Sequence, residues 1–160
     1  MKPYPCGFRG DERRSCTCDA YSVRRYMARL SGPLLDRIDM HVEVRGVQFD
    51  RLQSRAAGPG SAELREKVLE ARDRQLHRFN GAGVSCNASM GPKLVSEHCR
   101  LSKAGTSLVK TAFEKRGLSA RSYDRVLKVS RTIADVSGKE KIKPEHLAQA
   151  LNYRGLELGE

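Results

Sequence analysis

Residues 119–138, SARSYDRVLKVSRTIADVSG, decide the fold of this chain. The stretch predicts one long amphipathic helix that Ser119 caps and that ends at Gly138. Small or apolar side chains recur along one face, at Tyr123, Val126, Leu127, Ser130, Ile133 and Ala134. The opposite face carries Arg121, Arg125 and Lys128. The helix therefore offers one face to a core, and the simplest interpretation of the other is a solvated basic surface.

Four more helices are expected around this one, because helix start signals recur from residue 60 onward. The expected caps or first residues are Ser61, Ser89, Ser102 and Pro144. Gly117 is placed to end the helix that starts at Ser102. In the helix after Ser61, Gln75 is the polar exception in an apolar series that includes Leu64 and Val68. Five helices with short connections predict a compact, mainly α bundle over residues 61–160.

The residues before position 60 have a different character. Residues 1–18 are rich in Gly, Pro, Cys and charge, which predicts a loop. Residues 19–31 predict a short helix capped by Asp19, and the alternation over Met40–Val44 predicts a strand. The stretch SRAAGPGSA, residues 54–62, has linker composition. We therefore expect an N-terminal segment over residues 1–46, a linker over 47–60 and a helical domain over 61–160.

The segment SGPLLDRIDM, residues 31–40, places Arg37 between Asp36 and Asp39 just before the predicted strand. Arg37 would either form a surface ion pair with a neighbour, which is common and contributes little, or reach an anion outside its own subunit. A guanidinium suits the second task because it stays charged and presents a planar fork of donors to phosphate oxygens. Arg121 is a second candidate, because the helix dipole disfavours a cation in the first turn unless an anion lies nearby.

Composition limits the partners. Lys and Arg outnumber Asp and Glu by 30 to 19, so the net charge is +11 at pH 7. This balance favours polyanions such as nucleotides, nucleic acid or acidic protein surfaces, although the excess is spread along the chain rather than gathered in one stretch. No apolar run is long enough to span a bilayer and no secretory signal is visible, so we expect a cytoplasmic protein with no membrane partner.

Five cysteines, an odd number, argue against a simple disulfide scaffold. Cys6, Cys16 and Cys18 lie close in sequence, and clustered thiols in a reducing compartment suggest a metal, Zn²⁺ in particular. A structural zinc site takes four ligands, however, and no histidine precedes His41. We therefore expect these three thiols to hold zinc weakly, with a water or a borrowed ligand, or not at all. The two remaining cysteines, expected to be ordinary buried residues, are Cys86 and Cys99.

These motifs, in this order, resemble the C-terminal part of the Mg-chelatase-like AAA+ ATPases, the bacterial ComM/YifB group. The N-terminal match is PCG…GD…R…CTC…RRYMARLSGPLLDRIDMHVEV. The helical match comprises SAELREKVLEARDRQLHRF, CNASMGP, GLSARSYDRVLKVSRTIAD and IKPEHLAQALNYR. The resemblance covers nearly the whole chain. It implies a mainly α fold, a helical-bundle lid domain preceded by a short terminal fragment of an α/β P-loop ATPase core.

The resemblance also implies roles for the two arginines. Arg37 stands where the family has the arginine finger that reaches the nucleotide of the adjacent subunit. Arg121 stands where the family has its sensor 2 arginine, near the phosphates in its own subunit. The cofactors implied for the full-length family are ATP and Mg²⁺, and the implied partners are neighbouring subunits of a homo-oligomeric ring. DNA is a further expected partner, because the family is associated with DNA processing during transformation.

The chain departs from the family pattern in its first residues. The family usually opens this region with NPCPCG, whereas here Lys2 stands at the Asn position and Tyr4 at a Cys position. The sensor 1 Asn is therefore missing, and a four-thiol cluster is reduced to three. The sequence also contains no Gly-x-x-x-x-Gly-Lys-Ser/Thr loop and no acidic Walker B strand. We expect a piece of a larger ATPase or a degenerate remnant, without catalysis of its own.

Two functional classes stay open at this point. The first is the finger and lid portion of an ATP-driven ring motor. The second is a basic helical module that binds nucleic acid, which the net charge of +11 supports. Affinity measured against salt concentration separates the two, because a phosphate-backbone binder loses affinity steeply as salt rises. The absence of tryptophan argues against a platform that stacks bases.

Overall fold

The computed structural model of the chain describes residues 5–8, 14–29, 31–42, 44, 47, 49, 53 and 58–154. The chain divides into two compact units. The first comprises residues 1–38, 42–56 and 156–160, and the second comprises Asp39–His41 together with residues 57–155. The short segment Asp39–His41 thus packs with the second unit, although its sequence neighbours on both sides belong to the first.

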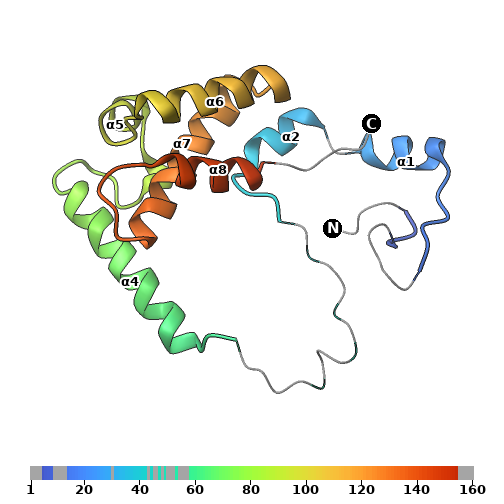
Figure 1. The fold of residues 1–160 in the computed structure, drawn as a ribbon, viewed down its shortest axis with the longest axis horizontal. Helices are drawn as coiled ribbons and strands as arrows, with labels where there is room; N and C mark the ends of the chain where they lie inside the picture. The colour runs from blue at the N-terminus through green and yellow to red at the C-terminus, as the bar shows by residue number, and fades with distance from the viewer. Residues whose placement is uncertain are drawn as a thin grey trace. The chain divides into compact units, whose positions relative to one another are not determined.

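The first unit contains two short helices, α1 (Ala20–Met27) and α2 (Gly32–Arg37), seen in Figure 1. Asp19 caps α1 as the sequence predicts, because its carboxylate accepts a hydrogen bond from the Ser22 amide at 2.6 Å. Ser31 caps α2 in the same way. Pro33 lies in the first turn of α2, where no helical hydrogen bond needs its missing N–H. Helix α2 therefore has a defined start and ends at Arg37.

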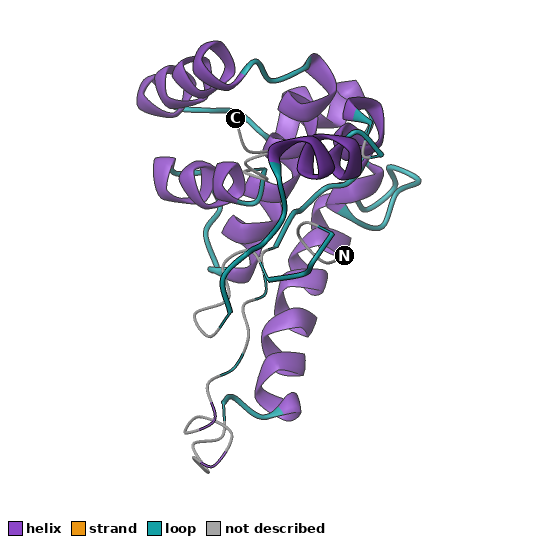
Figure 2. Cartoon of the chain, turned by 90° about the vertical axis from the view of Figure 1, so that its right-hand side faces the viewer, coloured by secondary structure: helices purple, strands orange, loops and turns teal. Residues whose placement is uncertain are grey.

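The second unit is a bundle of helices. Its elements are α4 (Ser61–Arg78), the 3₁₀ turn η1 (Asn87–Ser89), α5 (Pro92–His98), α6 (Lys103–Arg116), α7 (Ala120–Val136) and α8 (Pro144–Asn152). Helix α7 packs against α4, α5, α8 and η1, and α6 packs against α8. Figure 2 shows helices and loops, with no strand, in the described part of the chain. The mainly α prediction is confirmed, and residues 119–138 supply the central helix.

Four of the predicted helix signals are confirmed. Ser119 and Ser102 each accept a hydrogen bond at 3.1 Å from the backbone amide three residues further on, and so cap α7 and α6. Gly117 ends α6 in the left-handed region, at φ 58°, where a side chain would be disfavoured. Pro144 is the first residue of α8. Because each of these signals acts locally, the sequence alone is enough to locate these three helices.

Two predicted caps are wrong by a small displacement. The N-cap of α4 is Gly60, and Ser61 is already its first helical residue. The N-cap of α5 is Gly91, whereas Ser89 closes the preceding 3₁₀ turn. Neither glycine offers a side-chain acceptor, so these two helices begin without a side-chain capping hydrogen bond.

The core of the second unit lies between α7 and its neighbours. The buried apolar residues are Phe79, Met90, Val95, Cys99, Val109, Val126, Leu127, Ala134, Ile142, Leu147, Ala150 and Leu151. The predicted apolar face of α7 is confirmed at Val126, Leu127 and Ala134, while Tyr123 keeps 38% of its surface exposed. Cys99 is buried as predicted, but Cys86 is only half-buried, because it lies on the loop before η1. Burying a large aliphatic side chain stabilises a fold by about 1.5–3 kcal/mol.

Helix α4 is covered by the bundle over its C-terminal half only. Ala71, Gln75 and Phe79 are buried, whereas Leu64 and Val68, which continue the same apolar series, are 49% and 55% exposed. Figure 1 shows the N-terminal end of α4 leaving the other helices of its unit. The apolar series predicted for this helix therefore extends beyond the part of the bundle that can bury it.

A buried ionic network lies beside the apolar core. Asp135, fully buried near the end of α7, accepts hydrogen bonds from Arg78 on α4, from Asn87 in η1 and from Arg131 one turn earlier in α7. Burial alone would raise the pKa of the Asp135 carboxyl, but the hydrogen bonds from Arg78 and Asn87 outweigh it, so this pKa lies below its usual value. Arg78 and Arg131 thus depend on Asp135 for the neutralisation of their charges, and Asn87 adds a neutral hydrogen bond.

The remaining donors of the network are also satisfied. Arg131, 2% exposed, donates to the carbonyl oxygens of Lys139 and Glu140, in the turn between α7 and α8. The backbone amide of Asn87 donates to Gln75 Oε1 at 3.1 Å. The polar exception predicted in α4 is therefore a buried hydrogen-bond acceptor. The network joins α4, η1 and the α7–α8 turn through one carboxylate.

The predicted strand over Met40–Val44 is wrong for the residues that the structure describes. Residues 40–42 and 44 form neither helix nor strand. A strand needs a neighbour to pair with, and the described part of the chain provides none. The amide of His41 donates instead to the carbonyl oxygen of Tyr153, just after α8, at 2.6 Å. The apolar–polar alternation of this segment is therefore not a sheet pattern here.

Candidate functional site

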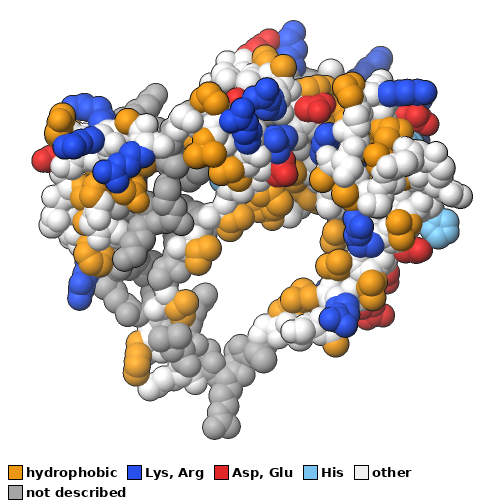
Figure 3. Space-filling view, turned by 180° about the vertical axis from the view of Figure 1, so that it is seen from behind, with side chains coloured by type: hydrophobic (Ala, Val, Ile, Leu, Met, Phe, Trp, Pro, Cys, Tyr) orange, Lys and Arg blue, Asp and Glu red, His pale blue; other side chains and the backbone are white. Residues whose placement is uncertain are grey.

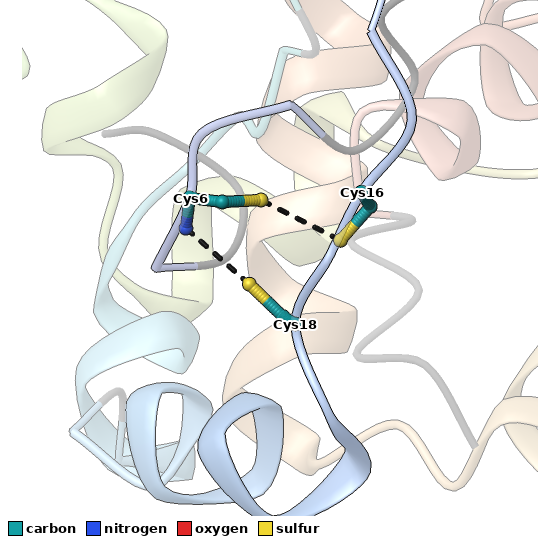
Figure 4. A group of neighbouring side chains, drawn as sticks. All are labelled: Cys6, Cys16 and Cys18. Atoms are coloured by element: carbon teal, nitrogen blue, oxygen red, sulfur yellow. Dashed lines mark hydrogen bonds between the residues drawn. The ribbon is translucent and has the colours of Figure 1, made fainter.

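The three N-terminal cysteines come together in the first unit. The sulfur atoms of Cys6, Cys16 and Cys18 all lie within 4.8 Å of one another, and the sulfurs of Cys6 and Cys16 are 3.5 Å apart. Figure 4 shows the three side chains pointing toward one another from two stretches of loop. The cluster precedes α1, because Cys18 is followed directly by the cap residue Asp19. The structure thus brings together all three residues that the sequence singles out for a metal.

Backbone amides donate hydrogen bonds to two of these sulfurs. The Phe8 amide donates to the Cys6 sulfur and the Cys6 amide donates to the Cys18 sulfur, each at 3.4 Å. The bond from Phe8 lowers the pKa of the Cys6 thiol from 9.0 to about 7. The hydrogen bond with the Cys6 thiol raises the pKa of Cys18 to about 11. One thiol of the cluster is therefore much more acidic than its neighbour.

Arg37 is the last residue of α2 and its side chain is exposed, as the sequence predicts. Among the residues that the structure describes, no carboxylate forms an ion pair with it. The predicted alternative of a local pair with Asp39 is not what is seen, because Asp39 pairs elsewhere. Arg37 thus presents a guanidinium to solvent at the end of a helix.

Arg121 is the second residue of α7, and its side chain is exposed. It points away from the bundle, as predicted, and no described residue forms an ion pair with it. Ser119 caps the same helix end, where the backbone N–H groups of the first turn favour an anion. An exposed guanidinium beside a helix start is a combination that can bind phosphate oxygens.

Asp39 and Arg125 form an ion pair that the sequence does not suggest. The Arg125 guanidinium donates to the Asp39 carboxylate, and the two residues are 86 positions apart in sequence. Arg125 lies one turn after Arg121 on α7, and Asp39 lies two residues after Arg37. No spacing rule connects positions so distant, so only the folded chain reveals this pair.

The basic face predicted for α7 is smaller than its sequence suggests. Arg125 is paired with Asp39. Lys128, with 21% of its side chain exposed, lies 3.8 Å from Asp124 and donates to the carbonyl oxygen of Ala88. On the one face that Figure 3 draws, the Lys and Arg side chains lie in separate groups among hydrophobic ones. Of the three predicted basic residues, only Arg121 is exposed and has no ion-pair partner among the described residues.

A cleft of about 390 Å³ opens along α7 in the second unit. Its lining is largely apolar, with Met40, Val129, Ile133 and Val136 among the residues that form it. The cleft carries no glycine-rich loop of the kind that cradles phosphates, so it does not resemble a nucleotide site. None of the helices in the described part of the chain is long and apolar enough to cross a bilayer.

Two family models match the chain one after the other. The model described as magnesium chelatase, subunit ChlI matches residues 1–52. The model described as magnesium chelatase, subunit ChlI C-terminal matches residues 58–154. The first match contains the cysteine cluster and Arg37, and the second contains Arg121 and the helical bundle.

Curated relatives match the chain over nearly its whole length. The competence protein ComM of Haemophilus influenzae is 41% identical over 158 residues, 98% of this chain. The uncharacterized protein YifB of Escherichia coli is 34% identical over 160 residues, and an uncharacterized protein of Mycobacterium tuberculosis is 33% identical over 150 residues, 94% of this chain. In each case the match spans 30% of the relative's own length.

Proposed function

The chain belongs to the magnesium chelatase subunit ChlI family, of the ComM/YifB kind, and on that premise we propose that it supplies two arginines to an ATP-driven ring. Arg37 acts as a finger on the nucleotide of the neighbouring subunit. Arg121 contacts the phosphates within its own subunit. The chain spans only 30% of the length of the curated relatives above, so the ring, its ATP and its Mg²⁺ are part of the proposal.

One observation carries the proposal, namely that both arginines are exposed and lack a carboxylate partner among the described residues. Three other arginines of the bundle, by contrast, are engaged: Arg125 with Asp39, and Arg78 and Arg131 with Asp135. A cation that the fold leaves unpaired, at a helix end, is available to an outside anion. The same two positions are those that the family resemblance singles out.

The proposed chemistry is electrostatic. During phosphoryl transfer, negative charge spreads over the oxygens of the transferring group, and an arginine finger that stabilises it raises the rate by about 10³–10⁵-fold in related systems. Arg37 would supply that stabilisation. Arg121, near the N-terminus of α7, would hold the phosphates together with the first backbone amides of the helix. Mg²⁺, held by residues outside this chain, would neutralise the β- and γ-phosphate oxygens.

A chimera tests the proposal. The matching segment of the Haemophilus influenzae relative is replaced by this chain, and ATP hydrolysis and nucleotide affinity are measured with and without Arg37→Ala. We expect hydrolysis to fall by about 10³-fold or more, with nucleotide affinity nearly unchanged, because the finger acts on a neighbour's site. Arg65→Ala is the matched control, since Arg65 on α4 is exposed and has no ion-pair partner in the part of the chain that the structure describes. Unchanged hydrolysis in Arg37→Ala would exclude the finger role.

DNA is the partner that we propose for such a ring. The name of the Haemophilus influenzae relative connects that protein with competence, and the net charge of +11 favours a polyanion. The alternative function, a nucleic-acid-binding module acting on its own, is less well supported, because two of the three residues of the predicted basic face of α7, Arg125 and Lys128, are engaged within the bundle. Tight, salt-sensitive binding of DNA by the isolated chain would favour the alternative.

A further inference from the structure

We propose that Cys6, Cys16 and Cys18 bind one Zn²⁺ ion through their three sulfur atoms, with the fourth position of the ion open to solvent. The proposal concerns the first unit alone and does not depend on the function proposed above. It rests on the arrangement of the sulfurs, on the amides that surround them and on the exposure of the cluster.

The distances between the sulfurs suit a zinc ion. A Zn–S bond of about 2.3 Å in a tetrahedral site places neighbouring sulfurs about 3.8 Å apart. The sulfurs of Cys6 and Cys16 are 3.5 Å apart, and all three lie within 4.8 Å of one another. A disulfide would use two of these sulfurs and leave the third without a partner. One ion, by contrast, can bind all three.

The backbone around Cys6 is arranged for a thiolate. Gly7 has a φ of 74°, in the left-handed region that favours glycine, and this turn aims the Phe8 amide at the Cys6 sulfur. The Cys6 amide in turn points at the Cys18 sulfur. Amide donors stabilise sulfur atoms that carry negative charge, which is the form that binds metal. The loop around Cys6 therefore favours a thiolate at this residue and directs a further amide at the Cys18 sulfur.

The ligand set selects the kind of ion and leaves one position free. Thiolates favour zinc over magnesium or calcium, which take oxygen ligands. Among the described residues, no histidine or carboxylate joins the three sulfurs within the same distance. Cys16 is exposed, so water has access to the remaining position. We therefore expect an exchangeable ion, held less tightly than in a closed four-thiolate site.

The consequence for the fold is local. An ion bound by Cys6, Cys16 and Cys18 would join the turn at residues 5–8 to the loop segment that leads into α1. Cys18 directly precedes Asp19, whose carboxylate caps α1. The ion would therefore fix the entrance of α1 where the short first unit has few buried side chains of its own.

The test uses the full chain, reduced and freed of metal under anaerobic conditions. Co²⁺ is added as a spectroscopic probe, and its sulfur-to-cobalt charge-transfer band is measured. Zn²⁺ is then added to displace the Co²⁺, and the loss of the band is followed. Bound zinc per chain is measured after gel filtration. Protection of each cysteine from iodoacetamide is mapped by peptide mass spectrometry with and without zinc. Cys16→Ser is the test variant, and Cys86→Ser is the matched control, because Cys86 is half-buried and lies outside the cluster.

We expect one zinc per chain, a cobalt–thiolate band, and zinc-dependent protection of Cys6, Cys16 and Cys18 but not of Cys86. Cys16→Ser should lose the band and most of the bound zinc, while Cys86→Ser should keep both. The proposal is overturned if the reduced chain binds no zinc, if Cys16→Ser binds it as the parent does, or if protection falls on Cys86. It is also overturned if a disulfide between Cys6 and Cys16 forms equally fast with and without zinc.

Discussion

The carboxylate of Asp39 accepts a hydrogen bond from the guanidinium of Arg125. Asp39 follows Arg37 by two residues, and Arg125 follows Arg121 by one helical turn. The pair therefore links the chain that leaves α2 to the helix that carries the second candidate arginine. The hydrogen bond from His41 to the carbonyl oxygen of Tyr153 holds the same segment at the end of α8.

Breaking this pair should loosen the segment Asp39–His41 with little effect on global stability. The Asp39 side chain is 57% exposed, so Asp39→Asn should lower the free energy of unfolding by less than about 1 kcal/mol. Amide exchange at His41 should nevertheless become faster. The control is Asp124→Asn, which removes the partner of Lys128 and leaves the segment in place. A double-mutant cycle with Arg125→Ala that gives no coupling energy would show that the pair does not hold the segment.

The 160-residue chain on its own should not hydrolyse ATP. It contains neither a phosphate-binding loop nor a Walker B acid, and Lys2 stands where the family has its sensor 1 Asn. The measurement is phosphate release by the purified chain at saturating ATP and Mg²⁺. Turnover that disappears on Arg37→Ala in this isolated chain would contradict the prediction, because it would mean that the chain carries a complete site.

Asp135→Asn should destabilise the bundle by about 3–5 kcal/mol, because it leaves Arg78 and Arg131 buried without a counter-charge. Urea denaturation followed by circular dichroism measures the change. The matched control is Asp73→Asn on α4, whose carboxylate is 70% exposed and should matter by less than about 0.5 kcal/mol. Similar effects of the two substitutions would show that the network contributes nothing particular to stability.

His146 should make the stability of the bundle depend on pH. Its side chain is 4% exposed, and its Nδ1 accepts a hydrogen bond from the backbone amide of Lys143 at 3.1 Å. Burial lowers the pKa of His146 below its usual 6.5. As the pH falls below 6.5, the unfolded chain therefore binds more protons than the folded one. The free energy of unfolding should then decrease as the pH decreases, by at most about 1.4 kcal/mol per pH unit.

The measurement is the free energy of unfolding between pH 5 and pH 7.5, a window chosen around the usual pKa of a histidine of about 6.5. His146→Asn keeps an oxygen that can accept from the Lys143 amide but does not titrate, so its stability should change less over this range. His77→Asn serves as the control, because the His77 side chain is 79% exposed. An equal pH dependence in the parent and in His146→Asn would assign the effect to other groups.

Amide protection should be concentrated after residue 60. The bundle over residues 61–154 contains the buried core and the ionic network, whereas no residue of α1 is buried. Hydrogen exchange followed by mass spectrometry should therefore show slow amides on α7 and α8 and fast amides in peptides that end before Asp39. Equally strong protection of both parts would mean that the N-terminal segment folds as stably as the bundle.

Local signals predict most of the helices, whereas contacts between residues that are distant in sequence could not be predicted from the sequence alone. Ser119, Ser102, Gly117 and Pro144 act on their own helix ends, so their effect can be recognised in a single sequence. The strand over Met40–Val44 was predicted from alternation alone, which cannot reveal whether a partner strand exists. Tertiary packing decided that segment instead, through the hydrogen bond of His41 with Tyr153.

The same distinction between local and non-local features applies to the candidate site and to the buried ionic network. The three cysteines are close in sequence, so a cluster could be predicted, and the two exposed arginines were recognised through motifs of the family. The burial of Arg78, Arg131 and Asp135 could not be predicted, since periodicity marks apolar faces and says nothing about buried polar side chains. The spacing of Arg131 and Asp135, four residues apart on one helix, was the one visible signal, and it also fits many solvent-exposed pairs.

The buried position of Asp135 has a practical consequence for work at high ionic strength. Dissolved salt screens charges that are in contact with solvent, and it reaches buried pairs much less. The charges that hold α4, η1 and the α7–α8 turn together are 15% exposed or less. The bundle should therefore stay folded at salt concentrations that release a bound polyanion. If the protein binds the DNA proposed above, loss of that DNA on a salt gradient would then be dissociation from an intact surface, and the protein would be recovered from the eluate in its native form.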